Sequence, residues 1–466
     1  MKKISLTFIC AFLFLLSNAQ SGLSGFWIDT VSVGVVPLRL VLHFYEKDTL
    51  LALDFYSIDQ TKQPIPLKGW VRDKDSIFAK EKRVMIDFSL HYDSINQRMS
   101  GIMKQRGTEF PLMLKPINSL PVSLRPQTPK APFPYKIEEV SIPNKKAKIT
   151  LGGTLTLPEK GENLKAIVLL HGSGPHDRDE TIFDHKLFLI LADSLTKQGY
   201  AVLRYDKRGI KKSQGNHAKA TISDFYDDAC AAIEFLRNHK RIDKNSIGII
   251  GHSEGGIIAP MVAAKDKKIA FIASLVGSVQ PGNELLLAQC KLLLQSQGVG
   301  EDTIAVDNKI RAFIFDEVLK NGNAKDFANK LSEALERYVS NLSEREKEIL
   351  SWNSVTKASL VMAHATPYMK YFIALQPEKY ITKVKSPVLA IFGGKDIQVP
   401  ALENAGIMRR CLQKAGNEHH SRVEIIEGAN HLLQKCNQCT IAEYGQIEET
   451  IMPEVLELIF SWVKER

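Results

Sequence analysis

A serine with glycines on both sides ends an apolar run in the stretch IIGHSEGG, residues 249–256. The apolar residues before it predict a buried strand, and the GGIIAPMVAA that follows predicts a helix. Gly251 and Gly255 permit a tight, strained turn between two such elements, which would project the Ser253 hydroxyl away from the backbone. An ordinary strand-to-helix turn has a similar composition. The serine is therefore a candidate nucleophile only if the chain also supplies a base and an acid.

Candidates for the acid and the base follow two later predicted strands. A serine at such a turn takes its partners in the chain order Ser, Asp or Glu, His, each just past the carboxyl end of a strand. The apolar stretch 386–394 runs into Asp396, and the stretch 422–428 runs into His431. We therefore predict a Ser253, His431 and Asp396 triad, in which the histidine deprotonates the serine and the aspartate orients the imidazole.

Each assignment has a simpler alternative. Asp396 follows two glycines, the setting of an ordinary turn aspartate, and His419 and His420 compete with His431. Those two histidines precede the last strand, at the end of a polar helix, so they would project from the wrong edge of the sheet. The joint placement of all three partners after strand ends favours the triad. His252, next to the serine, is expected to pack beside the turn.

Two backbone amides are candidates for binding the negative oxygen that forms when a nucleophile attacks a carbonyl group. Glu254 would begin the helix after the serine, where its N–H has no intrahelical acceptor. HGSGP, residues 171–175, follows the strand at 165–172, where a second donor is expected, and we assign that donor to the N–H of Ser173. The carboxylate of Glu254 is left without a role. Residues 206–209, DKRG, are expected to form an ion-paired loop brace.

From residue 136 onward, apolar strands alternate with helical stretches such as 221–239. The strands are apolar almost throughout, which is typical of a parallel sheet with helices on both faces. Between residues 278 and 385 the chain instead predicts several amphipathic helices, too long for a simple crossover, and we interpret them as an inserted helical cap. The predicted strands are 165–172, 200–206, 246–253, 269–277, 386–394 and 422–428.

The part of the chain before these strands has a different hydrophobic pattern. Residues 21–118 contain short alternating runs with polar turns between them, which predict a small antiparallel β domain. Five prolines between Pro121 and Pro134 favour an extended linker over 119–135. The α/β catalytic domain would then span 136–466.

The first twenty residues predict a secretory signal peptide. They carry two lysines, an apolar run from Ile4 to Leu16 and then small residues, and the run is too short to span a bilayer. We therefore expect an exported protein, periplasmic or extracellular. No later stretch reaches about 18 consecutive apolar residues, so no stable membrane insertion is expected. The formal net charge of +9 is dispersed along the chain, which argues against nucleic-acid binding.

Five cysteines follow the predicted signal peptide, at positions 230, 290, 411, 436 and 439. Cys436-x-x-Cys439 lacks a second matching pair, which argues against a structural zinc site. An oxidising compartment favours a disulfide involving Cys411, Cys436 or Cys439, but the spacing does not assign the pairing.

Over residues 136–466 the chain resembles the α/β-hydrolase superfamily. It is most similar to a group of bacterial exported serine esterases that also carry an N-terminal β domain and are related to serine aminopeptidase-like hydrolases. The stretches that carry the resemblance are HGSGPHDRDE (171–180), RYDKRG (204–209), GHSEGG (251–256), TPYMKYF (366–372), GGKDIQVP (393–400) and ANHLLQ (429–434).

The resemblance implies hydrolysis of small-molecule carboxylic esters, of short to medium acyl length, through Ser253, Asp396 and His431 and without a metal or other cofactor. A serine peptidase or aminopeptidase would use the same residues, but the sequence shows no pocket for a free N-terminus or a proline. A thioesterase is a further alternative, although an exported protein meets little acyl-CoA. A non-catalytic binding module usually has a damaged triad, whereas this one is intact.

Overall fold

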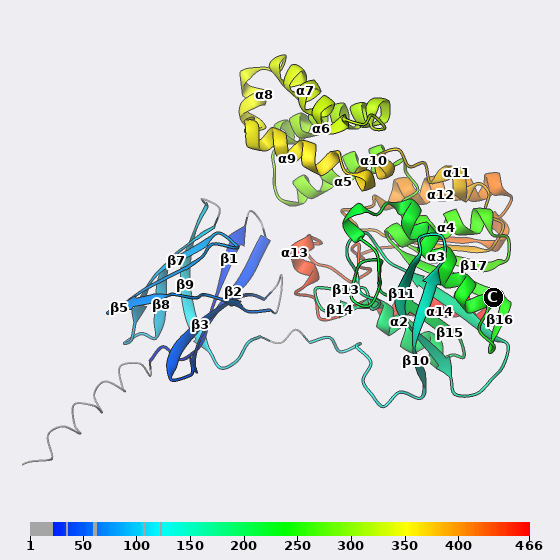
Figure 1. The fold of residues 1–466 in the computed structure, drawn as a ribbon, viewed down its shortest axis with the longest axis horizontal. Helices are drawn as coiled ribbons and strands as arrows, with labels where there is room; N and C mark the ends of the chain where they lie inside the picture. Colours follow the sequence, from blue (N-terminus) through cyan, green and yellow to red (C-terminus); the bar gives the residue numbers. More distant parts are fainter. Residues whose placement is uncertain (1–21, 34–35, 59–62, 106–107, 122–123) are drawn as a thin grey trace, which may run out of the picture. The chain divides into compact units, whose positions relative to one another are not determined.

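The structure is a computed structural model that describes residues 22–33, 36–58, 63–105, 108–121 and 124–466. The chain divides into two compact units, the first ending at Leu124 and the second running from Arg125 to Arg466 (Figure 1). The predicted signal peptide, residues 1–20, lies outside the described residues. Among the helices of the described part, none combines the length and the apolar character needed to cross a membrane.

The described strands of the first unit form one antiparallel sheet, in the order β4-β3-β2-β1-β9-β8-β7-β6-β5. The alternation of β7 shows why: Ile86, Phe88, Leu90 and Tyr92 are buried, and the residues between them are more exposed. The predicted antiparallel β domain is confirmed. Its strands are β1 (Gly25–Val33), β2 (Val36–Lys47), β3 (Leu50–Ser57), β4 (Ile65–Pro66), β5 (Val71–Asp73), β6 (Ser76–Glu81), β7 (Ile86–Asp93), β8 (Arg98–Gln105) and β9 (Thr108–Ile117).

The second unit is built on an eight-stranded sheet in the order β10-β11-β15-β12-β16-β17-β18-β19. β10 pairs with β11, and β11 with β15, in the antiparallel sense, whereas all pairs from β15 to β19 are parallel. The strands are β10 (Tyr135–Asn144), β11 (Ile149–Pro158), β12 (Leu164–Leu170), β15 (Ala201–Tyr205), β16 (Ile242–His252), β17 (Ile269–Leu275), β18 (Val388–Gly393) and β19 (Arg422–Ile426). A short hairpin, β13 (Thr181–Ile182) and β14 (His185–Lys186), stands apart from this sheet.

Helices cover both faces of this sheet, which explains why its central strands are apolar throughout. Val168 packs on the side of α3 (Ile222–Arg237), α4 (Glu254–Lys265) and α12 (Ala401–Ala415). Its neighbours Ile167 and Leu169 pack on the opposite side with α2 (Leu187–Lys197) and α14 (Pro453–Lys464). Successive residues of one strand therefore belong to two separate cores.

The helical insertion expected at 278–385 lies between β17 and β18 in the chain. Figure 1 shows its helices α6, α7, α8 and α9 grouped together. Helices α6, α7 and α9 enclose a small core of their own, which includes Ile314, Leu331 and Leu335. The last part of the insertion differs from a free cap, because Ile381 and Val384 are buried in the core of the main sheet. The helices are α5 (Gly282–Ser296), α6 (Glu301–Asn321), α7 (Phe327–Ser340), α8 (Glu344–Ile349), α9 (Ser354–His364), α10 (Pro367–Ile373) and α11 (Glu378–Ile381).

The proline-rich segment predicted as a linker is bound to the second unit over part of its length. Arg125 donates hydrogen bonds to the carbonyl oxygens of Ile447 and Gly445, at 2.8 and 2.9 Å. The side chain of Gln127 donates to the carbonyl of Ile451 at 2.7 Å and accepts from the amide of Thr450 at 2.7 Å. Side-chain hydrogen bonds thus hold this segment against the rest of the second unit, whereas its prolines by themselves predict only an extended conformation.

Candidate active site

Ser253 stands between β16 and α4, with φ 52° and ψ −112°. A positive φ is strained for any residue with a side chain, and here the strain is held by close packing on both sides. A Cβ on Gly251 would overlap the carbonyl of Gly255, and a Cβ on Gly255 would overlap the carbonyl of Leu170. The two glycines of the motif are therefore required sterically, because the turn brings three backbone segments into contact.

The structure brings the three predicted side chains together. Nε2 of His431 lies 3.0 Å from Oγ of Ser253, and Nδ1 of His431 lies 2.7 Å from Oδ2 of Asp396. The side chain of Asp396 is fully buried, and that of His431 is 7% exposed. The arrangement allows the histidine to accept the serine proton while its other nitrogen donates to the carboxylate.

The loops after β18 and β19 hold these two partners in place. Oδ1 of Asp396 accepts hydrogen bonds from the amides of Gln398 and Val399, at 2.7 and 3.0 Å. In the histidine loop, Oδ1 of buried Asn430 accepts from the amides of Leu432 and Gln434, at 2.9 and 3.0 Å. Backbone amides therefore leave one carboxylate oxygen, Oδ2, to face the imidazole.

The two candidate oxyanion donors lie next to the serine. A Cβ added to Gly172 would lie 3.3 Å from Cβ of Ser253, so the loop that carries Ser173 runs directly against the nucleophile. Glu254 is the first residue of α4, and its amide has no acceptor within its own helix. Both residues thus lie close to Ser253, and their amides remain the candidate donors for a tetrahedral oxyanion on its side chain.

The competing histidines do not join this arrangement. His419 and His420 form part of a short 3-10 helix, Glu418–His420, before β19, and both are exposed. His419 faces Glu418 at 3.7 Å. The sequence argument that places them at the other edge of the sheet agrees with this position.

The family profile of the alpha/beta hydrolase fold matches residues 165–437, more than half of the chain. The chain belongs to this family. The predicted α/β-hydrolase fold is therefore confirmed, and the matched region contains Ser253, Asp396 and His431.

Two curated proteins resemble this chain over about two thirds of its length. Esterase EstD of Thermotoga maritima is 25% identical over 314 residues, which cover 66% of this chain and 64% of EstD. The match thus spans less than two thirds of that relative. An uncharacterized 31.7 kDa protein of Escherichia coli, from the traX-finO intergenic region, is 23% identical and is covered over 94% of its length, against 67% of this chain. Among solved structures, an esterase of Pyrococcus furiosus is 16% identical and aligns over 71% of this chain and 91% of its own chain, with a TM-score of 0.42.

A buried ion pair that sequence reasoning missed lies next to the candidate triad. Nδ1 of His252 is 3.1 Å from Oε1 of Glu180, and Nε2 of His252 is 3.1 Å from the carbonyl oxygen of His431. A carbonyl oxygen and a carboxylate both act as acceptors, so the two contacts favour the imidazolium form of His252, in which each ring nitrogen carries a proton. The side chains of His252 and Glu180 are 2% and 0% exposed.

The charges of this pair stabilise each other. Burial by itself would raise the pKa of Glu180, but His252, with further contributions from His176 and His171, holds it down at about 2. Burial would lower the pKa of His252, but the charge of Glu180 and the hydrogen bonds to Glu180 and to the carbonyl of His431 raise it above its ordinary value. The only sequence clue to this pair is Glu180 at the end of the HGSGPHDRDE stretch.

A second buried pair involves the carboxylate of Glu254, for which the sequence indicates no role. Nζ of Lys207 lies 2.7 Å from Oε1 of Glu254, and the hydroxyl of Tyr368 on α10 donates to Oε2 at 2.6 Å. The side chains of Lys207 and Glu254 are 4% and 1% exposed. Burial and the neighbouring carboxylate raise the pKa of Tyr368 well above its ordinary value, so its hydroxyl stays protonated and remains a donor.

The rest of the DKRG loop matches its expected role as a brace. Arg208 contacts Asp228 at 2.7 Å and Asp224 at 2.9 Å, both on α3. Asp206 accepts from Arg178 at 2.8 Å. These ion pairs hold the loop after β15 against two neighbouring segments.

Two cysteines in the described part of the chain, Cys436 and Cys439, lie in a cluster of potential metal ligands. Cys436 and Cys439 are joined in a disulfide, and Cys411 is a free thiol. Glu443 lies close enough to the two sulfurs to complete a set of three potential ligands. However, its carboxylate already accepts hydrogen bonds from the amides of residues 437–439, the longest at 2.9 Å. These side chains thus brace the loop that follows His431.

Proposed function

We propose that this hydrolase is an exported serine carboxylesterase that cleaves small-molecule carboxylic esters of short to medium acyl length. The proposal is carried by one observation, the continuous contact from Ser253 through His431 to Asp396 at a strained turn. The Thermotoga maritima relative is named an esterase, which supports the choice of ester over peptide. Export rests on the signal-peptide pattern of residues 1–20 alone.

In the proposed reaction, Nε2 of His431 accepts the proton of the Ser253 hydroxyl as Oγ attacks the ester carbonyl carbon. The amides of Ser173 and Glu254 donate hydrogen bonds to the carbonyl oxygen as it becomes negative, and these hydrogen bonds are strongest in the transition state. His431 then donates its proton to the leaving alcohol oxygen, and an acyl-serine remains. Water, deprotonated by the same histidine, adds to the acyl carbonyl, and return of the proton to Oγ releases the acid.

Asp396 has an orienting role in this proposal. Its Oδ2 accepts from Nδ1 of His431, so the neutral imidazole keeps its lone pair on Nε2, facing Ser253. When the imidazole becomes charged, the adjacent carboxylate stabilises it. The carboxylate itself stays ionised throughout.

The cap is proposed to set the acyl preference, because it contacts the main body close to the candidate site. Tyr368 of α10 binds Glu254, the residue after the nucleophile, and Gln289 of α5 lies 3.4 Å from Gln398 of the Asp396 loop. Trimming or exchanging residues 278–385 should therefore shift the preferred chain length in a series of p-nitrophenyl esters. An unchanged series would contradict this part of the proposal.

The central experiment compares Ser253→Ala with the matched control Ser340→Ala, a serine at the exposed end of α7. We expect Ser253→Ala to lower turnover of p-nitrophenyl butyrate on the order of 10⁴-fold or more and to abolish labelling by a fluorophosphonate probe. Ser340→Ala should retain both. Faster cleavage of aminoacyl anilides than of esters would instead assign the site to a peptidase, and a wild-type enzyme that the probe does not label would refute a serine mechanism.

A further inference from the structure

Two buried ionic side chains meet at the backbone of one residue, Gly172. Nζ of Lys207 donates to its carbonyl oxygen at 2.7 Å, and Oε1 of Glu180 accepts from its amide at 2.5 Å. Lys207 and Glu180 carry opposite charges and bind opposite groups of the same residue. Neither side chain has a part in the proton transfers of the proposed reaction.

The bond from Lys207 sets the direction of the next amide. A trans peptide is planar, so the carbonyl of Gly172 and the N–H of Ser173 point in opposite directions. The cis peptide that the described part of the chain contains is Ala131–Pro132, so the Gly172–Ser173 peptide is trans. With its carbonyl held by Lys207, this peptide directs the Ser173 N–H away from Lys207.

That amide is available for a ligand. Within the described residues, the N–H of Ser173 donates to no protein acceptor. The peptide that carries it lies against Ser253, since a Cβ on Gly172 would be 3.3 Å from Cβ of the serine. Glycine on both sides, at 172 and 174, gives the segment the freedom to turn its carbonyl toward the serine instead. A turned peptide would present an acceptor to the oxyanion and would oppose the reaction.

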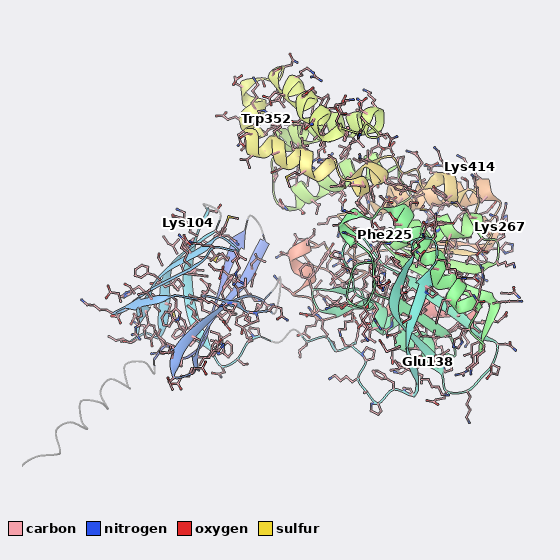
Figure 2. All side chains as sticks on the ribbon, in the orientation of Figure 1. Lys104, Glu138, Phe225, Lys267, Trp352 and Lys414 are labelled. Atoms are coloured by element: carbon pink, nitrogen blue, oxygen red, sulfur yellow. A yellow bond between two sulfur atoms is a disulfide. The ribbon has the colours of Figure 1, made fainter. Side chains whose placement is uncertain are left out.

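The ammonium group of Lys207 is itself held by several contacts. Its ammonium group has three protons, and three acceptors surround it: the carbonyl of Gly172, Oε1 of Glu254 at 2.7 Å, and the ring of Phe225, 4.1 Å from Nζ. Phe225 projects from α3, where Figure 2 labels it. Glu254 in turn is fixed by Tyr368 at 2.6 Å. These contacts place the ammonium group beside the carbonyl of Gly172 and satisfy its three protons.

We propose that Lys207 is a positioning residue that locks the Gly172–Ser173 peptide with its N–H toward the oxyanion of Ser253. The proposal rests on the proposed esterase function and adds to it a buried cation that never touches the substrate. It also gives the Glu254 side chain a purpose, because Glu254 supplies one oxyanion donor from its backbone and holds, through its carboxylate, the lysine that orients the other.

The test replaces Lys207 with methionine, which keeps the length of the side chain and removes the ammonium group. The matched control is Lys212→Met, a lysine five residues along whose Nζ is exposed and binds Glu139 at 2.9 Å. Because Lys207→Met leaves Glu254 buried with one bond fewer, the double variant Lys207→Met/Glu254→Gln removes both charges and serves as the second variant. Near-UV circular dichroism reports whether each variant is folded.

The readouts are kcat and KM for p-nitrophenyl butyrate, and inhibition by an alkyl trifluoromethyl ketone. The ketone adds to the serine and places a negative oxygen in the oxyanion position. We expect the folded Lys207 variants to lose about 100-fold in kcat, the scale of one lost oxyanion donor, with KM changed less than about threefold. The affinity for the ketone should fall in parallel with kcat, whereas Lys212→Met should match the wild type.

Other outcomes overturn the proposal. A folded double variant with kcat within about threefold of the wild type would show that the peptide holds its orientation without Lys207. A loss of kcat with undiminished ketone affinity would locate the effect outside the oxyanion donors. Failure of the proposed function is a separate result, because it would appear in the wild type as ester hydrolysis that survives Ser253→Ala.

Discussion

Nε2 of His252 lies 3.1 Å from the backbone carbonyl oxygen of His431, within hydrogen-bond distance. The residue before the candidate nucleophile thereby fixes the loop of the candidate base. Nδ1 of His252 lies 3.1 Å from Oε1 of Glu180, and this carboxylate oxygen also accepts a hydrogen bond from the amide of Gly172. Three loops that are far apart in the sequence are thus joined by one buried ion pair.

This pair should make stability depend on pH at both ends of the range. The pKa of Glu180 falls from 4.5 to about 2 on folding, so its contribution is full above pH 4.5 and is lost as the pH falls toward 2. The pKa of His252 is raised above 6.5 on folding, so its contribution is full below pH 6.5 and is lost as the pH rises through the folded value. Urea unfolding across pH 2–10 measures both slopes.

The variant Glu180→Gln should flatten both slopes and cost about 3 kcal/mol near pH 6, because it leaves a buried charge without its partner. Asp396, His431 and His176 also face this region, and they are present in both the wild type and the Glu180→Gln variant. The difference between the pH dependence of stability in the wild type and in the variant therefore isolates the contribution of the pair. Identical curves for the two proteins would show that the pair is not ionised.

Asp396→Asn should lower kcat by about 10⁴-fold with little effect on folding. An asparagine oxygen can still accept from the amides of Gln398 and Val399, but its NH₂ group would face Nδ1 of His431 and favour the wrong tautomer. Ester hydrolysis with near-UV circular dichroism measures the effect. The control Asp316→Asn, on the exposed side of α6, should keep full activity; an equal loss there would discredit the comparison.

Gly255→Ala should prevent stable folding of the second unit or cost more than about 4 kcal/mol, because the new methyl group would overlap the carbonyl of Leu170. Gly300→Ala is the matched control, since a Cβ at Gly300 meets nothing within 4 Å and φ is −66°. Thermal unfolding of both variants tests this. A Gly255→Ala protein as stable as the control would mean that the turn has room the structure does not show.

Tyr368→Phe should cost about 1–3 kcal/mol, because it leaves Oε2 of buried Glu254 without its donor. Tyr338→Phe, also in the helical insertion, removes an exposed hydroxyl that lies 3.5 Å from a carbonyl and should be almost neutral. Urea unfolding compares the two variants. Equal stabilities would indicate that the contact between α10 and the candidate site contributes nothing.

The three side chains of the candidate triad, which the structure brings together, can be picked out from the sequence because each sits at a local landmark. Ser253, Asp396 and His431 each follow the end of a recognisable apolar strand, and strands in a parallel sheet end along a common edge. The first unit is harder to predict. Strand β8, with Gly101 in its middle, and the two-residue strand β4 carry too little alternation to be recognised from the chain alone.

Sequence reasoning singled out the stretches that contain Glu180, Lys207 and Tyr368, but it did not indicate the partners of these side chains. Glu180, Lys207 and Tyr368 are ordinary polar residues in loops or on a helix, and each finds its partner at a distant position in the chain. Periodicity and spacing report how a segment meets solvent and its immediate neighbours. They do not report which charged side chains become buried opposite each other.

By itself, the sequence determined the alternation of strands and helices, the glycines that allow a strained turn at Ser253, and the order in which an acid and a base follow it. Only the tertiary structure decided which charges are buried together, that both ring nitrogens of His252 face acceptors, and that Lys207 binds the carbonyl of Gly172. The physical reason is that local patterns act through backbone geometry, whereas buried ion pairs depend on segments that meet only after the chain has folded.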